Sequence, residues 1–210
     1  MGDTTDDAHD DQTPRETTVR EYTANATSAV DFVRDSDAGD AWGTPPRIVD
    51  PLSKAIGGFD LDPASGAEPK PYADVRFTKE DDGLSRRWVV EHTDRPDVWF
   101  NPPYGREANP KWGKKALQEF KSGDVGTITA LLPGNTGTEW FGNYYAPAGT
   151  ITHLHERVEF HGAGDDGATF DPVIVSFGDF PDEYYDALST LGTVYDRHFE
   201  TDQTSVSDFA

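Results

Sequence analysis

"VWFNPPYG", residues 98–105, runs a short apolar segment directly into an asparagine, two prolines, a tyrosine and a glycine. The apolar residues predict a buried β-strand. The prolines predict its end, because proline has no backbone N–H to donate to a strand ladder. The strand therefore stops at a rigid corner that carries one amide, Asn101, and one aromatic ring, Tyr104.

The rest of the chain alternates between helical and extended patterns. Helices are predicted for residues 44–57, 109–123, 138–145 and 181–192, and Thr44 has the position expected of an N-cap before the first of them. Strands are predicted for residues 59–62, 98–100, 125–133, 150–160, 171–178 and 193–199, with residues 150–160 forming a bent strand or a strand pair. This alternation predicts an α/β fold, a three-layer sandwich with a mostly parallel sheet.

Two features limit the size of the folded part. Residues 1–40 are polar and acidic and are predicted to form a largely disordered tail, and residues 201–210 a C-terminal tail. Only about a dozen residues separate Gly66 from Phe77, which is too few for a full helix followed by a second strand. One domain over residues 41–200 remains.

The charge of the chain is extreme. Its 210 residues include 18 basic and 39 acidic side chains, which give a net charge of −21, and 27 of the acids are Asp. Self-repulsion on this scale destabilises a compact state unless salt screens it, and the screening length falls to roughly 3 Å at about 1 M salt. An Asp-rich, Lys-poor surface is typical of a protein from a salt-saturated cytoplasm, that of a haloarchaeon or of the host of its virus.

The basic residues are concentrated around the corner. Residues 70–121 contain 11 basic and 9 acidic side chains, whereas the segments on both sides are strongly acidic. A surface that contacts a polyanion needs such a cluster. The candidate contact residues are Arg76, Lys79, Arg86, Arg87, Arg106, Lys111, Lys114 and Lys115.

Several classes of protein are excluded. The chain has no cysteine, so disulfide frameworks and thiolate metal sites are ruled out. No apolar run has the length of a membrane span, and the acidic N-terminus is unlike a signal peptide, so we expect a soluble, cytoplasmic monomer. We expect no metal site, and interpret His153, His155 and His161 as structural or surface residues.

The corner has the chemistry to hold an amino group. Asn101 offers a carboxamide oxygen and Pro102 a carbonyl oxygen, and both accept hydrogen bonds without carrying charge. Together they can accept both hydrogens of one –NH2 group, while the ring of Tyr104 offers a face on which a planar base can stack. An amino group on a planar ring describes adenine or cytosine.

Other strand ends carry complementary groups. In "DLDPASG", residues 60–66, Asp62 can accept from an ammonium group, and the small residues after it let the backbone approach a ligand. "EDDGLSRRW", residues 80–88, contains an acidic pair that can accept from a second amino group. The hydroxyl of Thr44 at a helix start suits a carboxylate.

These blocks, in this order, resemble the phage-type DNA adenine-N6 methyltransferase (Dam-like) family. The resemblance covers about residues 41–180 and rests on "WGTP", "DLDPAS", "FTKEDDGLSRRW" and "VWFNPPYG", with "ALLPGNTGTEWF", "RVEFHG" and "DPVIVSFG" downstream. It implies a Rossmann-like class I methyltransferase fold, with residues 41–200 as the catalytic domain. It also implies transfer of a methyl group from S-adenosylmethionine to N6 of adenine at specific sites in double-stranded DNA.

The same resemblance implies roles for individual residues. The implied catalytic residues are Asn101, Pro102, Pro103 and Tyr104. The implied cofactor-binding residues are Thr44, Asp60, Asp62, Pro63, Ala64 and Asp82, with Asp81 as the alternative to Asp82 for the cofactor's adenine amino group. No ribose-binding residue is assigned, although Glu68 and Asp74 are candidates, and Trp140 and Phe160 are either further walls of the base site or core residues.

Other readings of the corner stay open. The same acceptors can hold an amino group of RNA or the amide of a protein glutamine. From a different class, the acidity suits a catalytically silent viral protein that mimics DNA or only binds the cofactor. For a DNA methyltransferase, restriction–modification, viral self-protection and regulatory marking are all compatible with the sequence.

Overall fold

The computed structural model describes residues 43–66, 71–147, 149–158 and 171–195. The predicted tails, residues 1–40 and 201–210, lie outside these ranges. The strands are β1 (Phe59–Asp62), β2 (Ala73–Arg76), β3 (Asp97–Phe100), β4 (Thr127–Pro133), β5 (Gly149–Leu154), β6 (Pro172–Phe177) and β7 (Gly192–Tyr195). The helices are α2 (Pro46–Ile56), α3 (Ala108–Ser122), the π-helix η2 (Phe141–Tyr145) and α4 (Asp182–Leu191).

The strands form one sheet in the order β2-β1-β3-β4-β6-β5-β7. The pairs β1–β2, β1–β3 and β3–β4 are parallel, whereas β6 is antiparallel to both β4 and β5, and β7 is antiparallel to β5. Strands β1 to β5 therefore run in one direction, and β6 and β7 run against them. The prediction of a mostly parallel sheet is confirmed, and the carboxyl ends of β1 to β5 meet at one edge.

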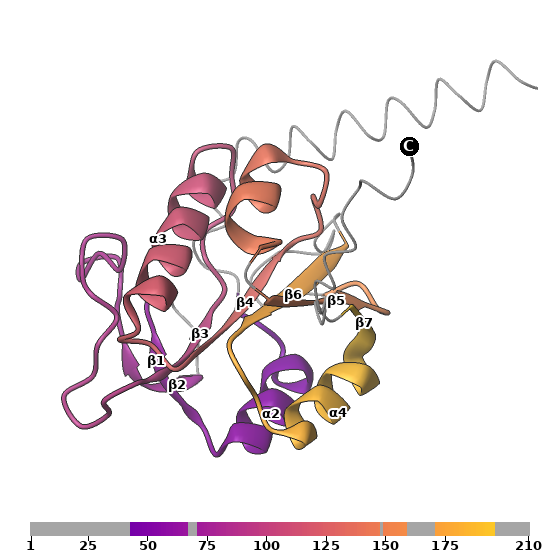
Figure 1. Ribbon diagram of the computed structural model, residues 1–210, viewed down its shortest axis with the longest axis horizontal. Helices are drawn as coiled ribbons and strands as arrows, with labels where there is room; N and C mark the ends of the chain where they lie inside the picture. The colour runs from indigo at the N-terminus through magenta and orange to yellow at the C-terminus, as the bar shows by residue number, and fades with distance from the viewer. Residues whose placement is uncertain (1–42, 67–70, 148, 159–170, 196–210) are drawn as a thin grey trace, which may run out of the picture. The chain divides into compact units, whose positions relative to one another are not determined.

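Helices cover both faces of the sheet (Figure 1). Helix α3 packs with η2 on one face, and α2 packs with α4 on the other. Each face has its own cluster of buried residues, which we call the α3 core and the α2 core. The predicted three-layer α/β sandwich is confirmed, and its architecture is that of a Rossmann-like methyltransferase fold.

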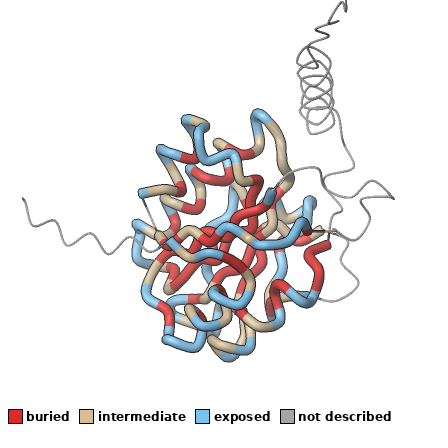
Figure 2. Tube along the Cα trace, turned by 90° about the vertical axis from the view of Figure 1, so that its right-hand side faces the viewer, coloured by how far each residue is buried: buried red, intermediate tan, exposed pale blue. Residues whose placement is uncertain are grey.

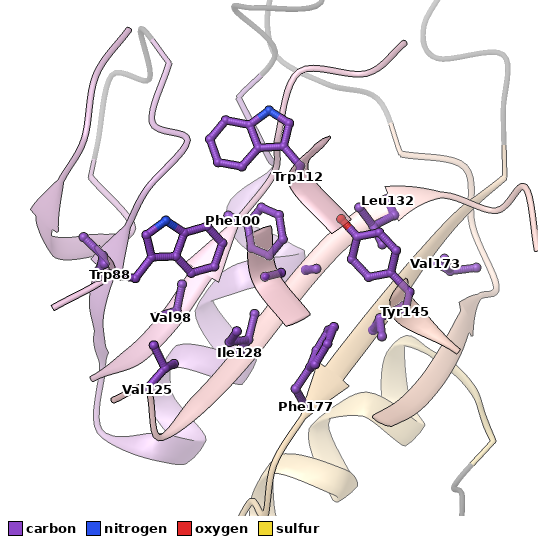
Figure 3. Packing of buried hydrophobic residues seen from close by; sticks show 14 of the residues in the cluster. Trp88, Val98, Phe100, Trp112, Val125, Ile128, Leu132, Tyr145, Val173 and Phe177 are labelled. Atoms are coloured by element: carbon purple, nitrogen blue, oxygen red, sulfur yellow. The ribbon is translucent and has the colours of Figure 1, made fainter. Parts of the chain in front are cut away.

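The centre of the sheet is buried along its whole length. Every residue of β4 and β6 is buried, which is why both strands are largely apolar in the sequence. Figure 2 shows buried stretches through the middle of the fold and exposed ones at its periphery. In the α3 core the ring centroids of Trp88 and Phe100 lie 5.3 Å apart, and Trp112 packs against both (Figure 3).

Helix α2 forms where the apolar spacing predicts it. Ile48, Val49 and Leu52 are its buried residues, and the helix ends at Gly57, whose φ of 84° is left-handed. The predicted N-cap is wrong. Pro45 has that position, and no side chain caps the helix. The prolines at the start already fit a first turn, where a missing N–H is harmless, so a capping hydroxyl is not required there.

The interval between Gly66 and Phe77, predicted to be too short for a full helix followed by a second strand, does contain a strand. Strand β2 lies in this interval and pairs in parallel with β1, with Phe59 opposite Ala73 and Leu61 opposite Val75. Residues 67–70 of the connection between β1 and β2 lie outside the described residues.

The remaining elements agree with the sequence, with changes in detail. Residues 149–154 form one strand that ends at Leu154, and residues 155–158 continue without strand structure. The helix predicted over residues 138–145 is present, but its main part is the π-helix η2. No helix in the described part of the chain is both long enough and apolar enough to cross a bilayer.

Candidate active site

Two sequence motifs meet at the carboxyl edge of the sheet. Strand β1 ends at Asp62, and the neighbouring strand β3 ends one residue before Asn101. The two strands are parallel, with Leu61 opposite Val98, so the loops that follow them leave the sheet side by side. This edge is where open α/β sheets bind ligands.

A cavity of about 450 Å³ opens between these loops. Its walls come from the loop after β1, the segment after β2, the proline corner and helix α3. The lining residues are Pro63, Ala64, Ser65, Gly66, Phe77, Thr78, Lys79, Glu80, Asp82, Gly83, Leu84, Pro103 and Trp112. Most of the exposed lining is apolar, as in sites that hold a flat organic ligand.

The loop after β1 is held rigidly. The carboxylate of Asp62 is buried and accepts a hydrogen bond from the backbone N–H of Ala64 at 3.0 Å. The loop is also tied to the end of β2, because the carbonyl of Asp62 accepts from the N–H of Phe77 at 2.8 Å and the N–H of Ser65 donates to the carbonyl of Phe77 at 3.1 Å. Pro63 and Ala64 thus form a fixed floor of the cavity.

The opposite wall separates the two neighbouring aspartates. Asp81 accepts hydrogen bonds from the backbone N–H and the hydroxyl of Thr78, both at 3.0 Å, and pairs with Arg86 at 3.1 Å. The Thr78 hydrogen bonds, and then the charge of Arg86, lower the pKa of Asp81. Asp82 has a left-handed φ of 56° and lines the cavity, whereas Asp81 does not. The geometry favours Asp82 as the ligand-facing residue.

Gly83 brings this wall into contact with the floor. A Cβ on Gly83 would lie 1.9 Å from the carbonyl oxygen of Pro63, so no other residue fits there without movement. The carbonyl of Gly83 accepts from the indole N–H of the buried Trp88 at 2.8 Å, which ties the wall to the α3 core. The wall that contains Gly83 therefore packs directly against the floor formed by Pro63 and Ala64.

The proline corner joins the cavity on its other side. Pro103 lines it, Pro102 is buried, and Asn101 and Tyr104 are half-buried. The hydroxyl of Tyr104 donates to Oδ1 of Asn101 and lies 3.2 Å from the carbonyl of Leu131. The corner is thus neither sealed inside the protein nor turned away from the loop that follows Asp62.

Helix α3 closes the far end of the corner. The N–H of Gly105 donates to Oδ1 of Asn109 at 3.3 Å, and the N–H of Asn109 donates to the carbonyl of Gly105 at 3.0 Å. Asn109 is a buried polar residue in the first turn of α3. The sequence patterns gave Asn109 only as the first residue of a predicted helix and did not predict this role, although its partner Gly105 lies four residues before it.

Thr44 is buried directly before α2. Its carbonyl accepts a hydrogen bond from the hydroxyl of Tyr72, but its own hydroxyl has no partner among the described residues. A buried hydroxyl without a partner is unfavourable, and such groups in native structures call for an explanation. Thr44 does not line the cavity of the proline corner.

Asp60 is not brought to the cavity. Its carboxylate accepts from the backbone N–H of Asp97 at 2.7 Å and from the hydroxyl of Thr93 at 3.4 Å, which fastens β1 to the start of β3. Asp60 lies two residues before the end of β1, so its side chain is set back from the carboxyl edge and bonds to the start of the neighbouring strand. A cofactor role for Asp60 stays a prediction from the resemblance.

Neither of the two candidate ribose-binding residues is placed at the cavity within the described part of the chain. Asp74 lies on β2, does not line the cavity and is exposed, and Glu68 lies outside the described residues. Glu80 does line the cavity, and a hydrogen bond from the hydroxyl of Thr78 at 2.8 Å lowers its pKa. Sequence reasoning missed Glu80 because it predicted no strand before it.

The basic cluster is partly occupied by internal ion pairs. Four of its members pair with acids: Arg86 with Asp81, Arg87 with Asp124, Lys111 with Glu107 and Lys115 with Glu119. Among the described residues, Arg76, Arg106 and Lys114 are exposed and make no ion pair. Arg106 lies two residues before α3 and two residues after Tyr104, whereas Lys114 lies in the middle of α3.

Other candidates have structural environments. Trp140 packs edge-on against Phe141 and Tyr145 in the α3 core, and Phe160 lies outside the described residues. His153 stacks edge-on with Tyr195, and Nε2 of His155 lies 2.9 Å from the hydroxyl of Thr193. Within the described ranges no three His, Cys, Asp or Glu side chains gather as a metal site would require.

The fold and this edge define an α/β protein of the methyltransferase type. The comparisons with known proteins identify the family. Residues 33–177 match the family described as DNA N-6-adenine-methyltransferase (Dam). The chain belongs to this family. A comparison with curated proteins found no match.

Proposed function

We propose that this protein is a site-specific DNA methyltransferase that uses S-adenosylmethionine to methylate N6 of adenine. The observation that carries the proposal is the junction of the proline corner with the cavity. Pro103 forms a wall of the same cavity that Pro63, Ala64 and Asp82 line. Acceptors for an amino group therefore lie at the border of a ligand-sized space, in a member of the adenine methyltransferase family.

The residues present fit the cofactor. The cavity volume lies within the usual range of roughly 300–1,000 Å³ for small-molecule sites. Its apolar lining suits a nucleobase, and Asp82 can accept from an exocyclic amino group. Thr44 is buried and does not line this cavity, so the predicted contact between its hydroxyl and the cofactor's carboxylate is not part of this fit. When bound, S-adenosylmethionine supplies a methyl group carried on a positively charged sulfur.

The corner supplies position and electrostatics. Asn101 and the carbonyl of Pro102 hold both hydrogens of the adenine amino group, so the nitrogen lone pair is directed away from them. The ring of Pro102 fixes the direction of its carbonyl, and the hydrogen bonds of Asn109 to Gly105 keep the corner from moving. Holding a nucleophile in one orientation is the main means of catalysis here, and no covalent intermediate is needed.

The target base must leave the duplex. N6 of adenine is hidden in a base pair, so the base is rotated out at a cost of roughly a few kcal/mol. The ring of Tyr104 offers a stacking surface for the extruded base. Arg106, exposed two residues after Tyr104, and Lys114, exposed in the middle of α3, are available to contact phosphates.

Transfer of labelled methyl groups from the cofactor to different acceptors tests the proposal. Purified protein should label duplex DNA and leave RNA and glutamine-containing peptides unlabelled. Asn101→Ala should abolish labelling with cofactor binding largely intact, whereas the exposed Asn143 on η2 provides a matched control, Asn143→Ala, with wild-type activity. Labelling of RNA or peptide alone would show that the methyl acceptor is not DNA. Absence of cofactor binding in the wild-type protein would favour a protein without catalytic activity.

A further inference from the structure

The hydroxyl of Tyr104 is directed into the protein. It contacts two oxygens, Oδ1 of Asn101 and the carbonyl of Leu131. The ring packs against the α2 core. Burial raises the pKa of Tyr104 well above its ordinary value, so the phenol keeps its proton and remains a hydrogen-bond donor at neutral pH.

The sheet register explains why these groups meet. Phe100 pairs with Ala130, so Asn101 leaves β3 level with Leu131 on β4. The two prolines then turn the chain back, which brings the Tyr104 hydroxyl to both the side chain of Asn101 and the carbonyl of Leu131. The hydroxyl thus links the reacting end of the corner to the buried centre of the sheet.

The contact between the Tyr104 hydroxyl and Asn101 bears on which end of the Asn101 carboxamide faces the substrate. The two ends of the Asn101 side chain differ, because Oδ1 accepts hydrogen bonds and Nδ2 donates them. A substrate amino group needs the accepting end, and the donating end would repel it. A carboxamide oxygen accepts two hydrogen bonds, so a hydroxyl that donates to Oδ1 can hold it in place while a substrate amino group donates to the same atom.

We infer that the Tyr104 hydroxyl is a positioning group for Asn101, with a role separate from stacking by the Tyr104 ring. The inference rests on the proposed function, since it concerns how the amino group of the substrate is held. The ring and the hydroxyl of Tyr104 thus have different roles. The ring supports the extruded base, and the hydroxyl keeps the accepting end of Asn101 at the site of transfer.

Tyr104→Phe separates the two parts because it keeps the ring and removes only the hydroxyl. We expect kcat for DNA methylation to fall about tenfold, in line with the loss of one buried hydrogen bond. The Kd for the cofactor should stay at its wild-type value. Extrusion of the base, followed by the fluorescence of 2-aminopurine placed at the target position, should also be unchanged. Tyr104→Ala is the matched variant, in which the fluorescence change and kcat should both fall.

The background of Asn101→Asp tests whether the hydroxyl acts through Asn101. A carboxylate accepts at both ends, so its orientation no longer decides whether the substrate meets an acceptor. Tyr104→Phe should therefore lower kcat less in this background than in the wild-type background, and the difference is the coupling between the two residues.

Three results would overturn the inference. Tyr104→Phe with wild-type or higher kcat would mean that the hydroxyl is idle or competes with the substrate. A loss of thermal stability, cofactor binding and base extrusion together would mean a purely structural role. An equal loss of kcat in both backgrounds would mean that the hydroxyl does not act through Asn101. Failure of the proposed function looks different, because wild-type protein would then methylate no DNA.

Discussion

Asp81 and Asp82 are neighbours in the sequence, yet the structure gives them different tasks. Asp81 is engaged by Thr78 and Arg86, so its charge serves to hold the loop. Asp82 has the one left-handed backbone found at a non-glycine residue in the described part of the chain, and it lines the cavity. An uncommon conformation beside a cavity is typical of a binding residue.

Replacement of Asp82 by alanine should weaken cofactor binding without unfolding the protein. One hydrogen bond to a charged group is worth about 1.5–3 kcal/mol, so we expect Kd to rise by about tenfold or more. Titration calorimetry with S-adenosylmethionine measures this change. Asp74→Ala, at an exposed acid away from the cavity, is the control and should bind normally. Equal losses in both variants would exclude a specific role for Asp82.

Thr44→Val tests the buried hydroxyl. The substitution keeps the shape of the side chain and removes a polar atom that has no partner in the described residues, so the free energy of unfolding should rise by up to about 1 kcal/mol. Cofactor affinity should fall at the same time, because the donor for the carboxylate is lost. Thermal unfolding and calorimetry follow the two effects. Stabilisation with unchanged affinity would show that the hydroxyl serves no ligand.

At the scale of elements, the cavity depends on contact between the loop that follows β1 and the segment that follows β2. The loop after β1 is tied to Phe77, and the segment after β2 rests on Pro63 through Gly83. Trp88 then anchors that segment to the α3 core. The binding site is therefore built by loops whose positions are set by the sheet edge beneath them.

Gly83→Ala should disturb this contact. The added Cβ would meet backbone at 1.9 Å, so the wall must move away from the floor of the cavity. Overpacking of this kind costs about 1–3 kcal/mol, and we expect both a lower unfolding temperature and weaker cofactor binding. Gly142→Ala is the control, because a Cβ there meets nothing within 4 Å. If the two variants behave alike in melting and binding, the contact has no structural importance.

Sequence patterns predicted the buried strands well and missed one of the two edge strands, β2. Strands β4 and β6 are entirely buried, so their apolar runs are unambiguous. Strand β2 is a four-residue edge strand in which only Ala73 is buried. The hydropathy pattern of so short and exposed a segment cannot be distinguished from that of a loop. Missing β2 also hid Glu80, which follows it.

The site could be predicted where the chemistry of a side chain alone indicates its role. Asn101 and the prolines could be interpreted from their own chemistry. The carboxylate of Asp60 bonds to Asp97, 37 residues away in the sequence, and this contact follows from sheet order, which no local pattern contains. Asn109 was missed although its partner Gly105 lies only four residues before it.

At the scale of the whole molecule, the net charge of −21 is the dominant property. Acids far outnumber bases, so ion pairs can neutralise only part of the surface, and repulsion among the remaining carboxylates opposes folding. Arg106, which makes no ion pair among the described residues, lies two residues after Tyr104. Residues 70–121, which contain the corner, are thus the least acidic part of a strongly acidic protein.

Stability should increase with salt. Raising KCl from about 0.1 M to about 2 M shortens the screening length to a few ångströms, which removes most of the repulsion. The unfolding temperature should rise by several degrees or more, and an equally concentrated sucrose solution should produce a smaller increase. Differential scanning calorimetry in the two series makes the comparison. A melting temperature that is independent of salt would contradict the importance of self-repulsion.

The most direct test of the central claim is single-molecule sequencing of DNA from cells that express the chain. The account predicts N6-methyladenine at one recurring sequence context in cells with the wild-type protein, and none in cells with Asn101→Ala. Unmodified DNA in both cases, methylation of a different base, or methylation that persists in Asn101→Ala would contradict it.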